Sequence, residues 1–167
     1  MVRPRGFSRC RWAHPGRSDR GDWPAVTDVV GAGFSPPIVV VAAVIERDDA
    51  FLLTLRPSGT HLADHWEFPG GKVHERETHA AALRRELFEE LDIVAGVGAL
   101  VHTVTHAYSE KTVELFFYRC EFDGEPKPMM GQGMRWVPRG ELASLPFPEA
   151  DRALIAILVA TGSLPRS

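Results

Sequence analysis

Four closely spaced glutamates are the residues of this sequence best suited to chemistry. Glu86, Glu89 and Glu90 fall within a predicted helix over residues 78–91, and Glu77 stands just before it. At about 100° per residue, the three helical acids share an arc roughly 100° wide. Glu86 and Glu90 form an i,i+4 like-charge pair, which costs an isolated helix about 0.2–0.5 kcal/mol. Carboxylates that converge at such a cost indicate a hard divalent cation with oxygen ligands, most readily magnesium.

A solvated acidic face on a surface helix is the alternative interpretation of the same residues. The preceding segment argues against it, because Gly70 and Gly71 allow backbone carbonyls to approach a ligand closely. Arg84 and Arg85 stand beside the acids and could hold one of them in place. We therefore favour a metal site over a solvated face.

The elements that must position these acids can be predicted from apolar periodicity. Leu83, Leu87 and Leu91 recur every four residues and define the buried face of the helix over residues 78–91. A run of valine, isoleucine and alanine over residues 38–45 is typical of a strand buried on both faces. Further strands are expected over residues 51–55, 105–108, 112–121 and 134–137, and a second amphipathic helix over residues 148–160. This alternation predicts an α/β fold, a mixed sheet with helices on both sides.

Composition and charge narrow the class of protein. The chain has 167 residues, of which 44% are hydrophobic and 25% charged, as in an ordinary globular domain. A net charge of −3 does not suggest a nucleic-acid groove, so no stable nucleic-acid partner is expected. Cys10 and Cys120 lie far apart in the sequence, so a disulfide framework is not expected. This agrees with a location in the reducing cytoplasm. The apolar run over residues 38–45 is shorter than the about 20 residues that cross a bilayer, so no membrane partner is expected.

Residues 1–36 differ in composition from the rest of the chain. We expect a disordered extension there, with a weak electrostatic tether to nucleic acid or a transit peptide as alternatives. The functional domain is expected over residues 37–162, followed by a tail over residues 163–167. The arginines of the extension are scattered among proline, glycine and serine without apolar periodicity: Arg3, Arg5, Arg9, Arg11, Arg17 and Arg20.

The acidic segment resembles the Nudix signature, in which glycine, glutamate and an arginine stand at set intervals. Asp92 departs from it, because it replaces a final glycine in a left-handed position that Asp can also adopt. The resemblance implies an α/β/α sandwich with a mixed β-sheet. The residues that match the signature are Gly71, Glu77, Arg85, Glu86, Leu87, Glu89, Glu90 and Ile93.

The resemblance also implies a hydrolase that acts on phosphoric anhydrides and splits a nucleoside triphosphate into a monophosphate and pyrophosphate. Glu86 or Glu89 would be the general base, and Arg85 would orient a glutamate. Lys72 is a candidate phosphate contact, with a solvated loop lysine as the alternative. The implied ligands of Mg²⁺, for which Mn²⁺ could substitute, are Gly70 through its carbonyl, Glu86, Glu89 and Glu90.

Outside the signature, the stretch LLTLRPSGTHLADHWEFPGGKV is similar to MutT-type enzymes, which hydrolyse oxidised purine nucleotides, and to relatives that act on cytidine triphosphates. By this resemblance Arg56 and Phe68 line the base pocket, although core packing is the alternative role of Phe68. The base-reading position falls on Asp151, where MutT has an asparagine. An ionised Asp only accepts hydrogen bonds, so oxidised guanine and cytosine both remain candidates. Capping of the second helix is the alternative role of Asp151.

A further departure concerns the number of metal ions. MutT-type enzymes often carry another acidic ligand at the position of Met130, and Met129 beside it is also apolar. Glu121 or Glu125 could substitute, so the number of ions is left open.

The resemblance implies three candidate functions. The first is a magnesium-dependent pyrophosphohydrolase that removes oxidised nucleotides such as 8-oxo-dGTP from the nucleotide pool and so assists DNA repair. The second is a (d)CTP or modified-dCTP pyrophosphohydrolase. The third is a Nudix-fold sensor that binds a nucleotide without cleaving it. A monomer or a homodimer is expected in each case.

Overall fold

The structure is a computed structural model that describes residues 36–59, 62–109 and 111–162. The expected extension over residues 1–36 therefore lies outside the described residues except at its last position. The expected tail over residues 163–167 lies outside them entirely.

The described residues form two sheets, and the first has the strand order β5–β1–β7–β6. β1 and β7 run parallel, whereas β5 and β6 are antiparallel to their neighbours, so the sheet is mixed as predicted. Burial of β1 begins at Val41, and its first three residues are half-buried, so the prediction of a strand buried throughout on both faces holds for its second half. The strands are β1 (Ile38–Val44), β5 (Gly70–Lys72), β6 (Gly96–Ala107) and β7 (Thr112–Glu121).

The second sheet is built around β3 (Ala50–Leu55), which pairs with β2 (Glu46–Arg47), β4 (Trp66–Glu67) and β8 (Gly133–Pro138). All of these pairings are antiparallel. Asp48 and Asp49 connect β2 to β3 with positive φ values of 50° and 60°. Two consecutive left-handed residues form the tight hairpin turn that matches the twist of paired strands.

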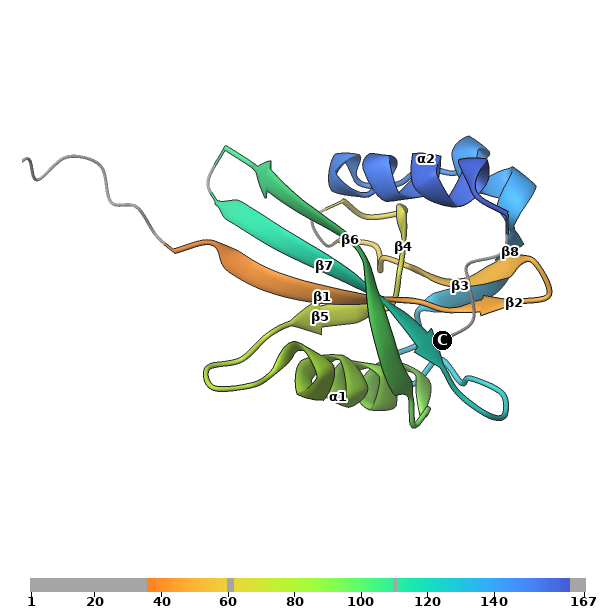
Figure 1. Ribbon diagram of the computed structural model, residues 1–167, viewed down its shortest axis with the longest axis horizontal. Coiled ribbons are helices and arrows are strands. Elements are labelled where there is room, and N and C mark those ends of the chain that lie inside the picture. Colours follow the sequence, from red (N-terminus) through yellow and green to blue (C-terminus); the bar gives the residue numbers. More distant parts are fainter. Residues whose placement is uncertain (1–35, 60–61, 110, 163–167) are drawn as a thin grey trace, which may run out of the picture. The chain divides into compact units, whose positions relative to one another are not determined.

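The two α-helices in the described part of the chain lie on opposite sides of the sheets (Figure 1). α1 (His79–Leu91) covers one side, and α2 (Arg152–Ala160) covers the other. The 3-10 helices η1 (Arg139–Ser144) and η2 (Glu149–Asp151) precede α2, so the helix predicted over residues 148–160 starts as a 3-10 turn. This layering confirms the predicted α/β/α sandwich. None of the described helices is long and apolar enough to cross a membrane.

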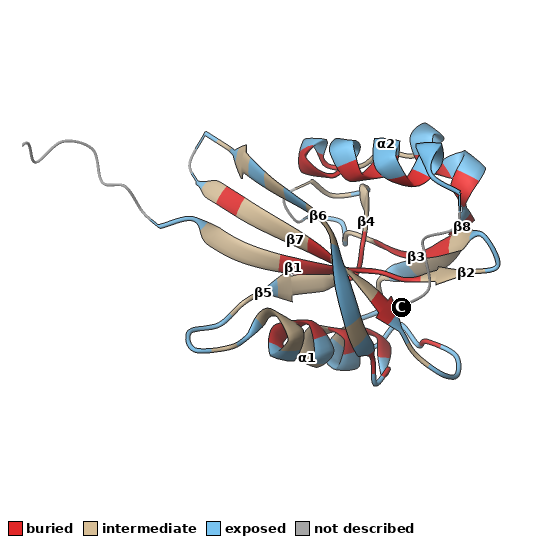
Figure 2. Cartoon of the chain, in the orientation of Figure 1, coloured by how far each residue is buried: buried red, intermediate tan, exposed pale blue. Residues whose placement is uncertain are grey.

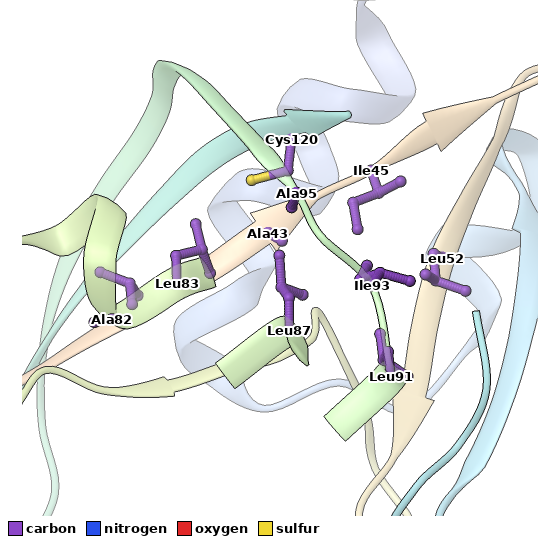
Figure 3. Packing of buried hydrophobic residues seen from close by; sticks show 11 residues of the cluster. Ala43, Ile45, Leu52, Ala82, Leu83, Leu87, Leu91, Ile93, Ala95 and Cys120 are labelled. Carbon is purple, nitrogen blue, oxygen red and sulfur yellow. The ribbon is translucent and has the colours of Figure 1, made fainter. Parts of the chain in front are cut away.

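The buried face of α1 is the one that its leucine spacing predicts. Leu83, Leu87 and Leu91 are fully buried and belong to one core cluster with Ala43 of β1 and Ile93 after the helix (Figure 3). Burial of a leucine side chain is worth about 1.5–3 kcal/mol, so this stripe is enough to fix the rotation of the helix about its axis. The outer faces of both helices are exposed (Figure 2).

Both ends of α1 follow local sequence signals. The hydroxyl of Thr78 accepts a hydrogen bond from the backbone N–H of Ala81 at 3.2 Å, which caps the N-terminus. Asp92 ends the helix in the left-handed conformation, with φ 56° and ψ 36°. The left-handed conformation predicted for Asp92 is therefore confirmed.

β6 is much longer than the strand expected over residues 105–108. Its first half contains two glycines and carries mostly exposed side chains, so apolar alternation does not reveal it. It exists because it pairs with β7, with irregular registers between Val97 and Leu100 and between Leu100 and His102. The short strands β4 and β5 were likewise missed, because they depend on partners in β3 and β1.

Candidate active site

The Gly70–Gly71 pair brings the backbone of β5 against both β1 and α1. Gly70 has φ 153°, and a Cβ there would lie 2.1 Å from the carbonyl oxygen of Val41, so glycine is required. A Cβ on Gly71 would lie 2.3–2.6 Å from the carboxylate atoms of Glu86. The first acid of the helix therefore lies directly against the glycine backbone.

Arg85 ties together the loop before α1, the strand β5 and the acidic face of the helix. Its guanidinium donates to both carboxylate oxygens of Glu77, at 3.0 and 2.9 Å, and to Oε1 of Glu86 at 2.8 Å. It also donates to the carbonyl of Lys72 at 3.0 Å. The hydrogen bonds from Arg85, followed by one from the backbone N–H of His74, lower the pKa of Glu77 to about 2. Glu77 is thus fully ionised and occupied in holding Arg85.

Glu90 is a half-buried carboxyl among other acids. Its pKa is raised to about 7, first by burial and then by the negative charges of Glu86 and Glu67. A hydrogen bond from the backbone N–H of Gly70 acts in the opposite direction. Crowding of this kind would be relieved by a positive charge placed between the acids.

Glu89 is the most exposed of the three helical acids, with 57% of its side chain accessible, and it lies 3.6 Å from the guanidinium of Arg85. Within the described residues, no three acidic, histidine or cysteine side chains converge closely enough to hold a metal ion as they stand. Glu86 and Glu89 are drawn toward Arg85 instead. Metal ligation by these acids stays a prediction.

The two acids considered as substitutes at the Met130 position are engaged elsewhere. Glu121 forms an ion pair with Arg119 at 3.3 Å, and Glu125 forms one with Arg47 at 2.9 Å. Neither lines the cavity described next. Met130 itself is 68% exposed.

A cavity of about 360 Å³ joins the acidic end of the site to the predicted base pocket. Its size lies within the usual range for sites that bind small molecules. Residues of β1 and β7 form part of its lining. Its lining includes Gly70, Gly71, Lys72 and Glu90, which we call the acidic end, and Arg56, Phe68 and Asp151, which we call the base end. The structure thus brings six of the nine predicted site residues to one cavity, whereas Arg85, Glu86 and Glu89 do not line it.

Phe68 lines this cavity and is also part of the core. It is buried, with its ring edge-on to Phe117 at 6.0 Å and stacked on Phe147 at 6.1 Å. Both interpretations of Phe68 are therefore compatible with its position. Lys72 is exposed at the cavity rim.

Asp151 is 4% exposed and lies at the end of η2. Its side chain makes no capping hydrogen bond to α2, so the structure does not bear out the alternative role as a helix cap. Burial, followed by the charge of Glu67, raises the pKa of Asp151 to about 7, and Arg56 opposes this shift. A carboxyl buried in this way at the cavity wall is available to a ligand.

Glu67 is a cavity residue that was not among the predicted site residues. It forms an ion pair with Arg56, and its charge raises the pKa of both Glu90 and Asp151. An acid enclosed between Trp66 and Phe68 just before the glycine pair was the available signal. Tyr108 and Lys111, at the β6–β7 hairpin, also line the cavity, and no local pattern marks them.

The fold and this arrangement of a glycine pair, an arginine and helical glutamates define a NUDIX domain. The NUDIX domain family matches residues 40–156, and the chain belongs to that family. The predicted Nudix resemblance is confirmed.

Known relatives share most of their length with this chain. It is 38% identical to the CTP pyrophosphohydrolase of Escherichia coli over 74% of this chain and 92% of the relative. It is 41% identical to the 8-oxo-dGTP diphosphatase of Haemophilus influenzae over 71% and 89%, respectively. The crystal structure of a MutT NUDIX hydrolase from Burkholderia pseudomallei superposes with a TM-score of 0.67 at 29% identity, covering 73% of this chain and 98% of that one.

Proposed function

We propose that this chain is a divalent-metal-dependent pyrophosphohydrolase that converts a nucleoside triphosphate and water into a monophosphate and pyrophosphate. The favoured substrate class is oxidised purine nucleotides such as 8-oxo-dGTP. The observation that carries the proposal is that one cavity is lined both by Glu90 and the glycine pair and by Arg56 and Asp151. A polyphosphate needs the first set of groups, and a base needs the second.

The donor atoms at the acidic end suit a hard divalent cation. Carboxylate and carbonyl oxygens are the ligands that Mg²⁺ prefers, and Mn²⁺ accepts the same set. The repulsion among Glu90, Glu86 and Glu67, which raises the pKa of Glu90, would be relieved by such an ion. The proposed ligands are the carbonyl of Gly70 and the carboxylates of Glu86, Glu89 and Glu90.

The residues of the chain then take distinct roles around the phosphates. When bound, the cation supplies neutralisation of the polyphosphate charge and lowers the pKa of water. Glu86 or Glu89 accepts the proton that the attacking water loses. Arg85 orients these glutamates, because it donates to Glu86 at 2.8 Å and lies 3.6 Å from Glu89. Lys72, at the same end of the cavity, adds a positive charge for the phosphates.

The base end is compatible with two substrates. In its ionised form, Asp151 accepts from the donors on the Watson–Crick edge of guanine or from the amino group of cytosine. Arg56 offers donors to a base carbonyl, and Phe68 offers an aromatic face. The second candidate function is therefore a (d)CTP or modified-dCTP pyrophosphohydrolase. Each function has support in the name of a relative with about 40% identity.

A nucleotide panel tests the proposal. The purified chain with Mg²⁺ is assayed for pyrophosphate release from 8-oxo-dGTP, dGTP, CTP, dCTP and 5-methyl-dCTP. We expect the highest kcat/KM with 8-oxo-dGTP, whereas a maximum with a cytidine nucleotide would establish the second function. Nucleotide binding without pyrophosphate release would indicate a non-catalytic sensor instead.

Two variants test the proposed ligands. Glu89→Gln and Glu90→Gln should each lower kcat by about 10³-fold, the order expected when transition-state charge stabilisation is removed, while circular dichroism shows an intact fold. Glu141→Gln is the matched control, since Glu141 is exposed on η1 and pairs with Arg135 away from the cavity. Full turnover in both ligand variants would refute the assignment.

A further inference from the structure

The loop over residues 127–132, which precedes β8, closes the C-terminal end of α1. The backbone N–H of Lys127 donates to the carbonyl of Leu91 at 2.9 Å, and that of Met129 donates to the carbonyl of Glu90 at 2.9 Å. A helix leaves its last four carbonyls without partners inside the helix. Here a loop from a distant part of the chain supplies donors to two of them, the carbonyls of Glu90 and Leu91.

The side chain of Gln132 connects this loop to α1 through hydrogen bonds. Its Nε2 donates to the carbonyl of Glu90 at 3.0 Å, across 42 positions in the sequence. Its Oε1 accepts from the backbone N–H of Met130 at 2.9 Å. The side-chain amide therefore stabilises both the conformation of the loop and the contact between the loop and α1.

Glu90 is consequently held at both ends. Its backbone carbonyl accepts from Met129 and from Gln132, and its carboxylate accepts from the backbone N–H of Gly70. Catalytic groups must be kept within about 0.5 Å of the productive geometry, and a displacement of about 1 Å can cost about 10²-fold in rate. A helix terminus would fray without such contacts, and Glu90 lies in the last turn of α1.

We propose that Gln132 is a positioning residue for Glu90, acting through its donation to the carbonyl of Glu90. This inference rests on the proposed function of Glu90 at the acidic end of the cavity. The loop takes part through its backbone and through this amide, whereas the side chains of Met129 and Met130 are exposed. It thus stabilises the acid instead of contributing a ligand.

Two substitutions separate the two hydrogen bonds of Gln132. Gln132→Glu removes the donor to Glu90 and keeps an acceptor for Met130, whereas Gln132→Met removes both. Lys127→Met is the matched control in the same loop, because it deletes the exposed Lys127–Asp92 ion pair but keeps the backbone hydrogen bond to Leu91. An exposed pair of this kind contributes little to stability.

Three measurements are made on each full-length variant: steady-state kcat and KM, hydrogen exchange of the Met129 amide, and Mn²⁺ binding without nucleotide by electron paramagnetic resonance. Both Gln132 variants should lower kcat at least about 10-fold with KM within about twofold. The Met129 amide should exchange faster, and Mn²⁺ should bind several-fold more weakly. The Lys127→Met protein should match the wild type in all three.

Wild-type kcat and Mn²⁺ affinity in Gln132→Glu would overturn the inference, since Gln132 would then serve the loop alone. If Gln132→Met does not fold, Gln132→Glu decides by the same criteria. If the wild-type protein hydrolyses none of the nucleotides, the proposed function fails by itself. Hydrogen exchange and Mn²⁺ binding still decide whether Gln132 positions Glu90.

Discussion

Arg85 donates hydrogen bonds to both carboxylate oxygens of Glu77, from Nε to Oε1 at 3.0 Å and from Nη2 to Oε2 at 2.9 Å. The same guanidinium donates to Glu86, whose carboxylate lies against the backbone of Gly71. A residue outside the helix therefore fixes the direction of an acid on it through one arginine. This relationship explains why an arginine with no place in the cavity wall belongs to the site.

Replacing Arg85 by lysine should lower kcat by roughly 10²-fold, the order expected for misplacement of a catalytic group. A lysine ammonium cannot reproduce the planar fork that contacts Glu77 and Glu86 together. KM should change much less, because Arg85 does not line the cavity. Arg84→Lys is the control at the preceding helical position, where the guanidinium donates to the carbonyl of Ala95 at 3.4 Å. Steady-state kinetics at saturating metal would reject this role if Arg85→Lys retained the wild-type kcat.

Gly71→Ala should preserve the fold and reduce turnover. The added Cβ would come within 2.3–2.6 Å of the Glu86 carboxylate, and a flexible side-chain end yields more easily than a backbone. Glu86 would move, and kcat should fall by about 10-fold to 10²-fold with little change in the melting temperature. Gly140→Ala is the matched control, since a Cβ there meets nothing within 4 Å. Equal kcat values for the two variants would show that the position of Glu86 is unimportant.

Asp151→Asn should change how stability depends on pH. The pKa of Asp151 is raised from 3.8 to about 7 by burial and by the charge of Glu67, so the folded state favours the protonated form. The stability that this provides is fully present below about pH 4 and is lost as pH rises through about 7. Asparagine does not titrate, so the variant should gain stability relative to the wild type between pH 4 and pH 8. Three pKa units correspond to a gain of up to about 4 kcal/mol.

Urea unfolding of metal-free protein at pH 5 and pH 8 measures this difference. Glu90 titrates in both proteins and therefore cancels in the comparison. Parallel pH profiles for the wild type and Asp151→Asn would mean that Asp151 is not buried as the structure has it.

Arg139→Met should destabilise the protein without altering the chemistry of the folded fraction. Arg139 is buried and pairs with Glu46 and Asp49, each at 2.6 Å. It also donates to the carbonyls of Leu158 and Thr161 at the end of α2. Breaking a buried ion pair costs about 3–5 kcal/mol, and denaturant unfolding should show a loss of that order. Lys127→Met, which removes an exposed pair, should cost less than about 1 kcal/mol.

Unchanged kcat per folded molecule is expected for Arg139→Met because none of these partners lines the cavity. A large fall in kcat at full folding would instead connect this network to the site.

Patterns among residues close together in the sequence were sufficient to predict α1, its two ends and the family. The spacing of Leu83, Leu87 and Leu91 predicted both α1 and the face it buries, because helical periodicity depends on nearby positions alone. The spacing of Gly71, Glu77, Arg85 and Glu86 predicted the family, because the signature is also confined to one short segment. Thr78 and Asp92 marked the two ends of the helix through backbone preferences of single residues.

Relations between distant segments required the folded chain. Glu67 faces both Glu90 and Asp151 only because β4, α1 and η2 meet at one cavity, and Gln132 reaches Glu90 across 42 positions. β6 begins at Gly96 because β7 offers it a partner, although its own side chains carry little apolar alternation. Such contacts come from long-range strand pairing and packing, whose energies depend on which segments meet in space and leave no periodic trace in either segment alone.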